Sequence, residues 1–128
     1  MIKEPVLFVN FKVYEKGSAA KAVELAKKCE KVSSETGKNI IPVVQPADIY
    51  RICKEVSIDI FSQHVDGVEP GAFTGHILIE DVKENGAKGT ILNHSENRIK
   101  MKNIKAAIKK CKLLGFPVVV CAKDANEV

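Results

Sequence analysis

Polar side chains able to donate protons and bind negative charge are concentrated at residues 93–98, directly after a short apolar run. The run 90–92 (Thr-Ile-Leu) predicts a buried strand, and Ser95 is a typical helix N-cap because its hydroxyl can accept a hydrogen bond from a first-turn amide. His94 would then lie at a helix start, where the positive end of the helix dipole keeps imidazole neutral. A neutral imidazole can donate a hydrogen bond to a carbonyl. The alternative is a capped helix with a solvated face of His94, Glu96 and Arg98.

A second pair of polar residues, Asn10 and Lys12, follows the continuous apolar run 5–9. That run predicts a strand buried on both faces, and residues two apart on an extended segment point the same way. An amide and an ammonium group aimed together from the end of a buried strand suit an anionic, oxygen-rich ligand. For Lys12 alone, the simpler explanation is a strand that leaves the core and enters solvent.

The elements that would position these residues alternate between strands and helices. Apolar runs predict strands at 5–9, 39–44, 59–63, 89–92 and 117–121, and helical periodicity predicts helices at 17–36, 46–56, 77–84 and 102–114. The first helix should end at Gly37 and bury an apolar stripe made of Ala22, Leu25, Ala26, Cys29 and Val32. This repeated order indicates a parallel sheet covered by helices.

Two architectures contain such a sheet: an open doubly wound sheet and part of a (β/α)8 barrel. No glycine-rich turn follows the first strand, so the dinucleotide-binding fingerprint of the open sheet is absent. Polar residues recur at the carboxyl ends of the first, third and fourth strands, namely Asn10, Lys12, Gln63 and His94. Barrel enzymes gather their chemistry at that face. We therefore expect one domain, residues 1–128, that forms part of a barrel.

The composition is that of an ordinary globular domain, with 128 residues, a net charge of +4, 45% hydrophobic and 28% charged residues. No apolar run approaches the roughly 18 residues of a membrane span, and the N-terminus lacks a signal-peptide pattern, so we expect a cytoplasmic protein. The basic excess is mostly Lys interspersed with Glu, which is not typical of a nucleic-acid-binding surface. Reduced, buried thiols are expected rather than disulfides or zinc ligands, because no CxxC spacing joins Cys29, Cys53, Cys111 and Cys121.

Four segments together resemble the triosephosphate isomerase family, most closely its short archaeal form. They read Val-Asn-Phe-Lys at 9–12, Gln-His-Val-Asp at 63–66, Pro-Gly-Ala-Phe-Thr-Gly-His at 70–76 and Asn-His-Ser-Glu-Asn-Arg at 93–98. The resemblance extends from Met1 to Cys121. It implies the interconversion of dihydroxyacetone phosphate and glyceraldehyde 3-phosphate without a cofactor. It also implies that the chain supplies the first five strands, with four main helices, of a (β/α)8 barrel.

The resemblance assigns roles to the polar residues at the strand ends. Asn10 and Lys12 match the pair that holds the substrate's oxygen and phosphate, and Lys12 also matches the group that stabilises the enediolate. His94 matches the neutral electrophile that polarises the substrate carbonyl. Glu96 matches an active-site carboxylate beside the lysine, and Ser95 matches the cap of the histidine's turn.

Other residues are expected to support the site or to form an interface. Gln63 and Arg98 would support the catalytic groups. Thr74 and Gly75 lie in the long loop 64–76, and loops of this length are usually functional. They match the loop tip that enters a neighbouring subunit's pocket, which implies a higher homo- or hetero-oligomer.

Two residues depart from the family pattern, and the three histidines do not indicate a metal site. Phe11 replaces the Tyr or Trp common in the family, and His76 replaces the glutamate of bacterial and eukaryotic forms but suits the archaeal pattern. His64 is expected to be structural. A zinc site built from His64, His76 and His94 is not expected, because no carboxylate or thiol spacing supports it.

The resemblance stops before the sixth strand. The catalytic glutamate base, the lid and the glycine-rich phosphate loops of the family would follow later in the barrel, and no glutamate here matches the base. The first and fifth strands would therefore be unpaired edges. Three explanations remain open: an N-terminal part completed by a chain carrying strands 6–8 of about 90–100 residues, a self-associating fragment, or a half-barrel with an unrelated binding role. We favour the first.

Overall fold

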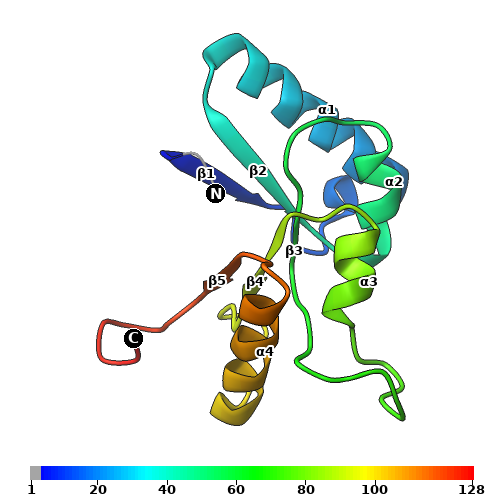
Figure 1. The fold of residues 1–128 in the computed structure, drawn as a ribbon. Coiled ribbons are helices and arrows are strands. Elements are labelled where there is room, and N and C mark those ends of the chain that lie inside the picture. Colours follow the sequence, from blue (N-terminus) through cyan, green and yellow to red (C-terminus); the bar gives the residue numbers. More distant parts are fainter. Residues whose placement is uncertain (1–3) are drawn as a thin grey trace.

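The computed structural model describes residues 4–128, and in this range the chain forms one sheet of five parallel strands, ordered as in the sequence. The strands are β1 (Val6–Asn10), β2 (Asn39–Val44), β3 (Phe61–Ser62), β4 (Gly89–Leu92) and β5 (Val118–Val120). The helices are α1 (Ala19–Thr36), α2 (Ile49–Cys53), α3 (Ile79–Glu84) and α4 (Met101–Leu113), with short 3-10 turns η1 (Glu15–Gly17) and η2 (Pro46–Asp48). The sheet curves, and all four helices lie on its outer side (Figure 1).

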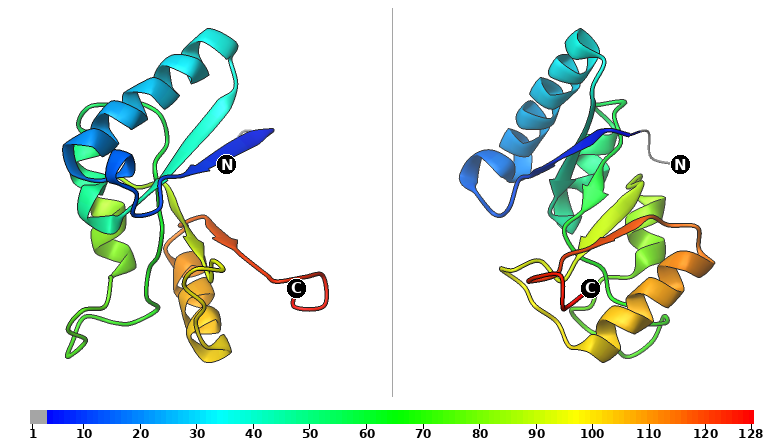
Figure 2. Two further views of the ribbon diagram at one scale, coloured as in Figure 1. Left: turned by 180° about the vertical axis from the view of Figure 1, so that it is seen from behind. Right: turned by 90° about the vertical axis from the view of Figure 1, so that its left-hand side faces the viewer.

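Strand pairing is long at one edge of the sheet and short in its centre. β1 pairs with β2 over five positions, from Val6 opposite Asn39 to Asn10 opposite Val43. β3 contributes only Phe61 and Ser62 to each of its two neighbours. Successive strands diverge strongly, so that β1 and β5 border the open side of an incomplete cylinder (Figure 2).

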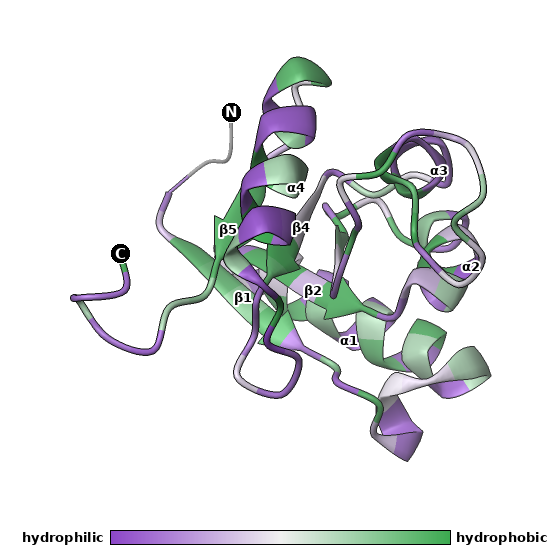
Figure 3. Ribbon diagram, turned by 90° about the horizontal axis from the view of Figure 1, so that it is seen from below, coloured by the Kyte–Doolittle hydropathy of each residue, from purple (hydrophilic) through white to green (hydrophobic). Residues whose placement is uncertain are grey.

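Two apolar layers hold the sheet in place. The layer between the sheet and the helices is the larger, and it includes Ala22 and Ala26 from α1 and Ile49 from α2. The layer on the concave side consists of Ile41, Val43, Phe61 and Ile91, with Val6, Phe8 and Val119 packed against it. Burial of each large aliphatic side chain in such layers contributes about 1.5–3 kcal/mol. Hydrophobic residues accordingly predominate on the strands, whereas hydrophilic residues lie on the outer faces of the helices (Figure 3).

The two edge strands are much less buried than the strands between them. Leu7 on β1 is 58% exposed and Val120 on β5 is 40% exposed, whereas β4 is buried throughout. No strand in the described range pairs with the outer edge of either one. A hollow of about 360 Å³ lies beside β1 and α1, and another of about 330 Å³ lies between α4 and the end of β5. The expectation of open edges is confirmed.

Helix α1 ends as predicted, but its apolar stripe is only partly correct. Gly37 has a φ of +67° and its N–H donates to Ser33 O, which is the expected left-handed stop. Ala22 and Ala26 are fully buried. Val32 was predicted to be buried, and this is wrong: it is 46% exposed. Val32 lines the hollow beside Leu7, on the outer side of an edge strand, where no described helix covers it.

The prediction of a helix that begins at Ser95 is wrong. Residues 93–100, all of which the structure describes, form a turn and an extended segment, and α4 begins only at Met101. Asn93 explains the difference, because its Oδ1 accepts a hydrogen bond from Ile99 N–H at 3.1 Å and its Nδ2 donates to Cys121 O at 2.9 Å. These bonds close the segment into a loop, so His94 does not directly precede a helix.

The remaining boundaries shift by a few residues. β2 has the predicted bounds, β1 includes Asn10, and β3 is shorter than the predicted 59–63. The four cysteines are free thiols, with Cys111 buried and the others partly buried. No helix within residues 4–128 has the length and apolar character needed to cross a membrane.

Candidate active site

The predicted polar residues from three strands meet at one rim of the curved sheet. Asn10 is the last residue of β1, Gln63 follows β3 directly, and His94 is the second residue after β4. Because parallel strands bring their carboxyl ends to the same edge, residues more than 80 positions apart become neighbours here. The Nζ atom of Lys12 lies 2.8 Å from Oε1 of Glu96.

Glu96 lies beside both Lys12 and His94. Its Oε1 accepts a hydrogen bond from Lys12, and its Oε2 lies 3.5 Å from Nδ1 of His94. The hydrogen bond and charge of Lys12 hold the pKa of the Glu96 carboxyl below its ordinary value. The same bond raises the pKa of Lys12. Lys12 is therefore an ammonium group and Glu96 a carboxylate at neutral pH.

The ring of His94 is oriented by its own turn. Asn97 N–H donates to His94 O at 2.8 Å, and Glu96 N–H donates to His94 Nδ1 at 3.2 Å. The backbone hydrogen bond to Nδ1 leaves Nε2 as the ring nitrogen that can donate to a ligand. His94 is 28% exposed at the rim.

The turn after β1 holds Asn10 and Lys12 on the same side. Phe11 between them is 2% exposed and belongs to the helix-facing layer of the core. Lys12 N–H donates to Asn10 Oδ1 at 2.9 Å, and Gln63 Nε2 donates to Lys12 O at 2.8 Å. The predicted convergence of Asn10, Lys12 and Gln63 is present in the structure.

Ser95 and Arg98 lie on the loop after β4 but do not have the predicted surroundings. Both are exposed, and Ser95 does not cap a helix. Arg98 forms an ion pair with Glu127, whose other carboxylate oxygen accepts from Lys123 N–H. An open hollow of about 490 Å³ at this place is lined by His94, Ser95, Arg98, Cys121, Ala122 and Lys123. This hollow lies on the open side of the rim, beside His94.

Sequence reasoning missed Asn93 as a residue that shapes the site. It is 4% exposed, has a φ of +60°, and connects the loop after β4 to the end of β5. An asparagine that directly follows a buried strand is a recognisable signal, because Asn tolerates the left-handed conformation better than most residues.

The geometry can now be compared with known proteins. The family model described as triosephosphate isomerase matches residues 5–128. The chain belongs to the triosephosphate isomerase family. A triosephosphate isomerase from Methanobacterium bryantii is 49% identical over 124 residues, which are 96% of this chain and 55% of that protein. One from Methanosarcina acetivorans is 44% identical over 120 residues, which are 94% of this chain and 54% of that protein.

The comparison of folds agrees with the family. The crystal structure of triosephosphate isomerase from Bartonella henselae matches with a TM-score of 0.77 and 18% identity, over 92% of this chain and 51% of that chain. The predicted fold class, five parallel strands of an incomplete (β/α)8 barrel with four main helices, is therefore confirmed. The chain spans about half the length of the curated triosephosphate isomerases that it matches.

Thr74 and Gly75, which in the resemblance to triosephosphate isomerases form an interface, lie apart from the rim. They occupy the exposed end of the loop between β3 and α3, which extends away from the sheet (Figure 1). Asp66 and Ile77 close the neck of this loop, because each backbone N–H finds an acceptor on the other residue at 2.8 Å. Within one chain the structure does not bring Thr74 or Gly75 to His94.

The three histidines do not form a common cluster in the structure. His64 Nε2 lies 3.1 Å from Asp66 Oδ1, and His76 stacks edge-on against Phe73 with 5.5 Å between ring centroids. No group of three or more potential metal ligands occurs among residues 4–128.

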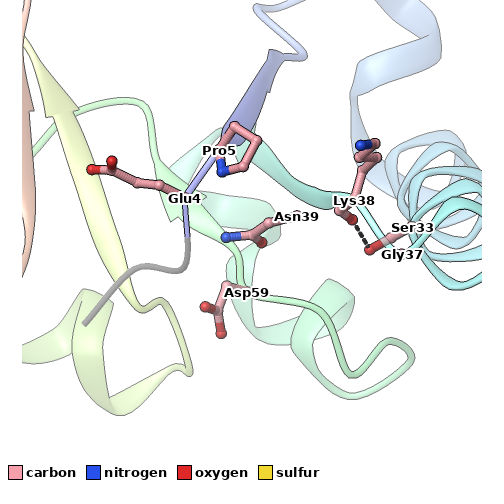
Figure 4. A pocket seen from close by; sticks show the side chains of 7 residues that line it. All are labelled: Glu4, Pro5, Ser33, Gly37, Lys38, Asn39 and Asp59. Carbon is pink, nitrogen blue, oxygen red and sulfur yellow. Dashed lines mark hydrogen bonds between the residues drawn. The ribbon is translucent and has the colours of Figure 1, made fainter.

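A further hollow of about 390 Å³ lies at the opposite rim, where the strands begin (Figure 4). Seven residues line it: Glu4, Pro5, Ser33, Gly37, Lys38, Asn39 and Asp59. Ser33 Oγ donates to Lys38 O at 2.6 Å and fixes the turn after α1. In barrel enzymes this rim serves stability rather than chemistry. The candidate active site is therefore the rim that carries Lys12 and His94.

Proposed function

We propose that this chain supplies the N-terminal part of a triosephosphate isomerase active site, which interconverts dihydroxyacetone phosphate and glyceraldehyde 3-phosphate through an enediolate. The observation that carries the proposal is the meeting of Lys12, Glu96 and His94 at the carboxyl rim of an incomplete parallel barrel. Asn10 and Lys12 would hold the substrate, and His94 would polarise its carbonyl.

The reaction moves one proton between adjacent carbons. The residues of this chain suit the stabilisation of negative charge on the substrate's carbonyl oxygen. A base removes a proton from the carbon beside the carbonyl, and the electron pair of that C–H bond shifts to place negative charge on the carbonyl oxygen. His94 Nε2–H can donate a hydrogen bond to this oxygen, and the Lys12 ammonium stabilises the charge as it forms. Return of the proton to the neighbouring carbon completes the isomerisation.

The base itself must come from another part of the barrel. The carboxylate of Glu96 is occupied by Lys12, and that of Glu127 by Arg98 and the backbone of Lys123. Neither is a free base aimed at the space beside His94. We infer that a C-terminal part with strands 6–8 supplies a glutamate and pairs with the exposed edges of β1 and β5.

The test is complementation. The chain is mixed with the C-terminal part of the Methanobacterium bryantii relative, which carries the remainder of the barrel, and isomerisation of glyceraldehyde 3-phosphate is followed in a coupled assay. We expect activity from the mixture, and a decrease of about 10²–10⁴-fold in kcat/KM for His94→Gln or Lys12→Met. Lys16→Met, which changes an exposed lysine in the nearby 3-10 turn η1, is the matched control and should retain activity. A stable complex without activity would refute the proposal.

A second candidate is an assembly module without catalysis. The exposed apolar edges Leu7 and Val120 favour it, because parallel edge strands can pair with a further copy of the same chain. Light scattering separates the two. If the chain is an assembly module, it should form a stable homo-oligomer that does not dissociate when the C-terminal part is added. If it is part of an isomerase, it should form a complex that contains both parts.

A further inference from the structure

The backbone at Lys12 has a conformation that residues with a Cβ atom rarely adopt. Its φ angle is +51°, in the left-handed region that favours glycine. Both backbone polar groups of Lys12 form hydrogen bonds with side chains. Its N–H donates to Asn10 Oδ1 at 2.9 Å, and its C=O accepts from Gln63 Nε2 at 2.8 Å. The conformation of Lys12 therefore depends on two polar side chains from different strands.

Gln63 is itself fixed in position. Its backbone N–H donates to Val44 O at 2.9 Å, which continues the pairing between β2 and β3 beyond Ser62. Its side-chain nitrogen lies near three acceptors: Lys12 O at 2.8 Å, Val43 O at 3.4 Å and Asn10 Oδ1 at 3.5 Å. All three neighbours are oxygens, so an amide NH₂ group, which only donates, fits this place and a carboxylate would not.

We propose that Gln63 is a positioning residue, which acts with Asn10 to hold Lys12 in its left-handed conformation and thereby directs the ammonium group to Glu96 and the substrate. A change of φ to a negative value would turn the Cα–Cβ bond of Lys12 and carry its Nζ away from Glu96, now 2.8 Å distant. The conformational part of this inference stands on the hydrogen bonds alone. Its consequence for catalysis rests on the proposed function.

Gln63→Met tests the inference, because it keeps the length of the side chain and removes both amide donors. Ser62→Ala is the matched control. It removes a buried polar group from the same strand, one that bonds to His64 and does not contact Lys12. Should Gln63→Met fail to fold, Gln63→Asn retains an amide that is one methylene too short to reach Lys12 O.

The first readout is the titration of Glu96, followed by NMR on the full chain with a labelled carboxyl carbon. The pKa of this carboxyl lies below its ordinary value because of the hydrogen bond and charge of Lys12. We expect that pKa to rise in Gln63→Met and to stay unchanged in Ser62→Ala. An unchanged Glu96 titration in folded Gln63→Met would overturn the inference.

The second readout is the kinetics of the chain combined with the C-terminal part. Gln63→Met should raise KM about tenfold and lower kcat/KM by about 10²-fold, as expected for a misplaced binding group. A merely structural role would reduce the amount of active complex at constant KM, and that result would also overturn the inference. If wild-type chain gives no activity while Glu96 still responds to Gln63, the proposed function fails and the placement of Lys12 by Gln63 stands.

Discussion

Glu96 joins two parts of the rim, because its carboxylate contacts Lys12 from the end of β1 and lies beside His94 on its own loop. The ion pair is solvent-exposed, with 32% of the Lys12 side chain and 56% of the Glu96 side chain accessible. Exposed pairs contribute little to stability. Under the proposed function, Lys12 would therefore exchange this partner for the phosphate of the substrate at small cost.

Replacing Glu96 by Gln should release Lys12 without destabilising the fold. We expect the pKa of Lys12 to fall toward its ordinary value, because the hydrogen bond and charge of Glu96 hold it up. The urea midpoint should remain unchanged. Titration of ¹³C-dimethylated lysines by NMR measures the pKa, and Glu24→Gln, which alters the exposed pair with Lys27, is the control. A Lys12 pKa that is the same in both variants would contradict this interpretation.

Lys110 carries a more strongly buried charge than any catalytic candidate. Its side chain is 8% exposed, and its Nζ lies 2.8 Å from Glu80 Oε1 on α3 and also donates to Val68 O in the long loop. We expect Lys110→Met to lower the free energy of unfolding by about 2 kcal/mol, between the values for exposed and fully buried pairs. Urea denaturation measures this, and Lys109→Met, on the exposed face of the same helix, should have no effect.

The effect of Lys110→Met should also depend on pH in a defined direction. Burial raises the pKa of Glu80, but the hydrogen bond and charge of Lys110 outweigh this, so the pKa lies below the ordinary 4.5. A lowered pKa stabilises the fold above pH 4.5, and this contribution disappears as the pH falls through the folded-state value. The stability difference between wild type and variant should be constant near pH 7 and shrink below pH 4.5. A difference that grows on acidification would refute the assignment.

Residue types and spacing predicted the gathering of Asn10, Lys12, Gln63 and His94, because the ends of parallel strands share one edge. The same reasoning failed at Ser95. Its helix-capping pattern is local, whereas Asn93 makes hydrogen bonds to Ile99 and to Cys121 on the next strand. Such tertiary bonds cannot be recognised from spacing alone. The left-handed conformation of Lys12 was equally invisible, since Lys has no preference for it.

The loop between β3 and α3 is an element with a rigid base and an exposed end. Its Gly67 lies against α4 so closely that a Cβ atom would come within 2.3 Å of Ala107 N and 2.4 Å of Ala106 C. Lys110 and the Asp66–Ile77 pair fix the same base. The base of the loop is thus anchored on α4.

Gly67→Ala should push this loop away from α4. We expect a loss of about 2 kcal/mol in unfolding free energy, because the new methyl group meets backbone rather than a movable side chain. Faster amide hydrogen exchange at residues 68–76 would accompany it. Gly71→Ala in the same loop is the control, since its Cβ would have ordinary contacts of 3.7 Å. Equal stability of the two variants would show that the loop is not anchored at Gly67.

Helices and long strands were predicted well, and short strands were not. The bounds of β2 could be predicted because a continuous apolar run follows Asn39. Those of α1 could be predicted because its apolar residues have helical periodicity and Gly37 ends it. β3 pairs through only two residues, although single backbone hydrogen bonds at Ile60 and Gln63 extend its contact with the neighbouring strands. The pairing of a strand depends on its neighbours in space, which sequence patterns do not contain.

The described part of the molecule is an open cylinder bordered by β1 and β5. These two edge strands differ in sequence, but each exposes an apolar side chain. The interior layer around Phe61 is closed by Phe8 on one side, at 5.2 Å between ring centroids, and reaches Val119 on the other. Further strands added to β1 and β5 would bury the exposed Leu7 and Val120. This is why we expect the C-terminal part to bind both edges.

Charges at the edges should prevent association of the chain alone. We expect the double variant Leu7→Lys and Val120→Lys to remain monomeric in light scattering at concentrations where the wild type forms larger species, because lysine on edge strands opposes pairing. It should also lose complementation by the C-terminal part. Leu113→Lys, an equally apolar and 78% exposed residue at the end of α4, is the control. Association that persists in the double variant would place the contact elsewhere.

The strand order of the sheet has a consequence for biosynthesis. Each strand is bonded only to the strands before and after it in the chain, so a polypeptide leaving the ribosome finds the neighbour of every new strand already made. The sheet can grow by successive addition, without waiting for a distant segment to close it. In a complete barrel of this order, the open edge of β5 would be the edge that the next strand joins.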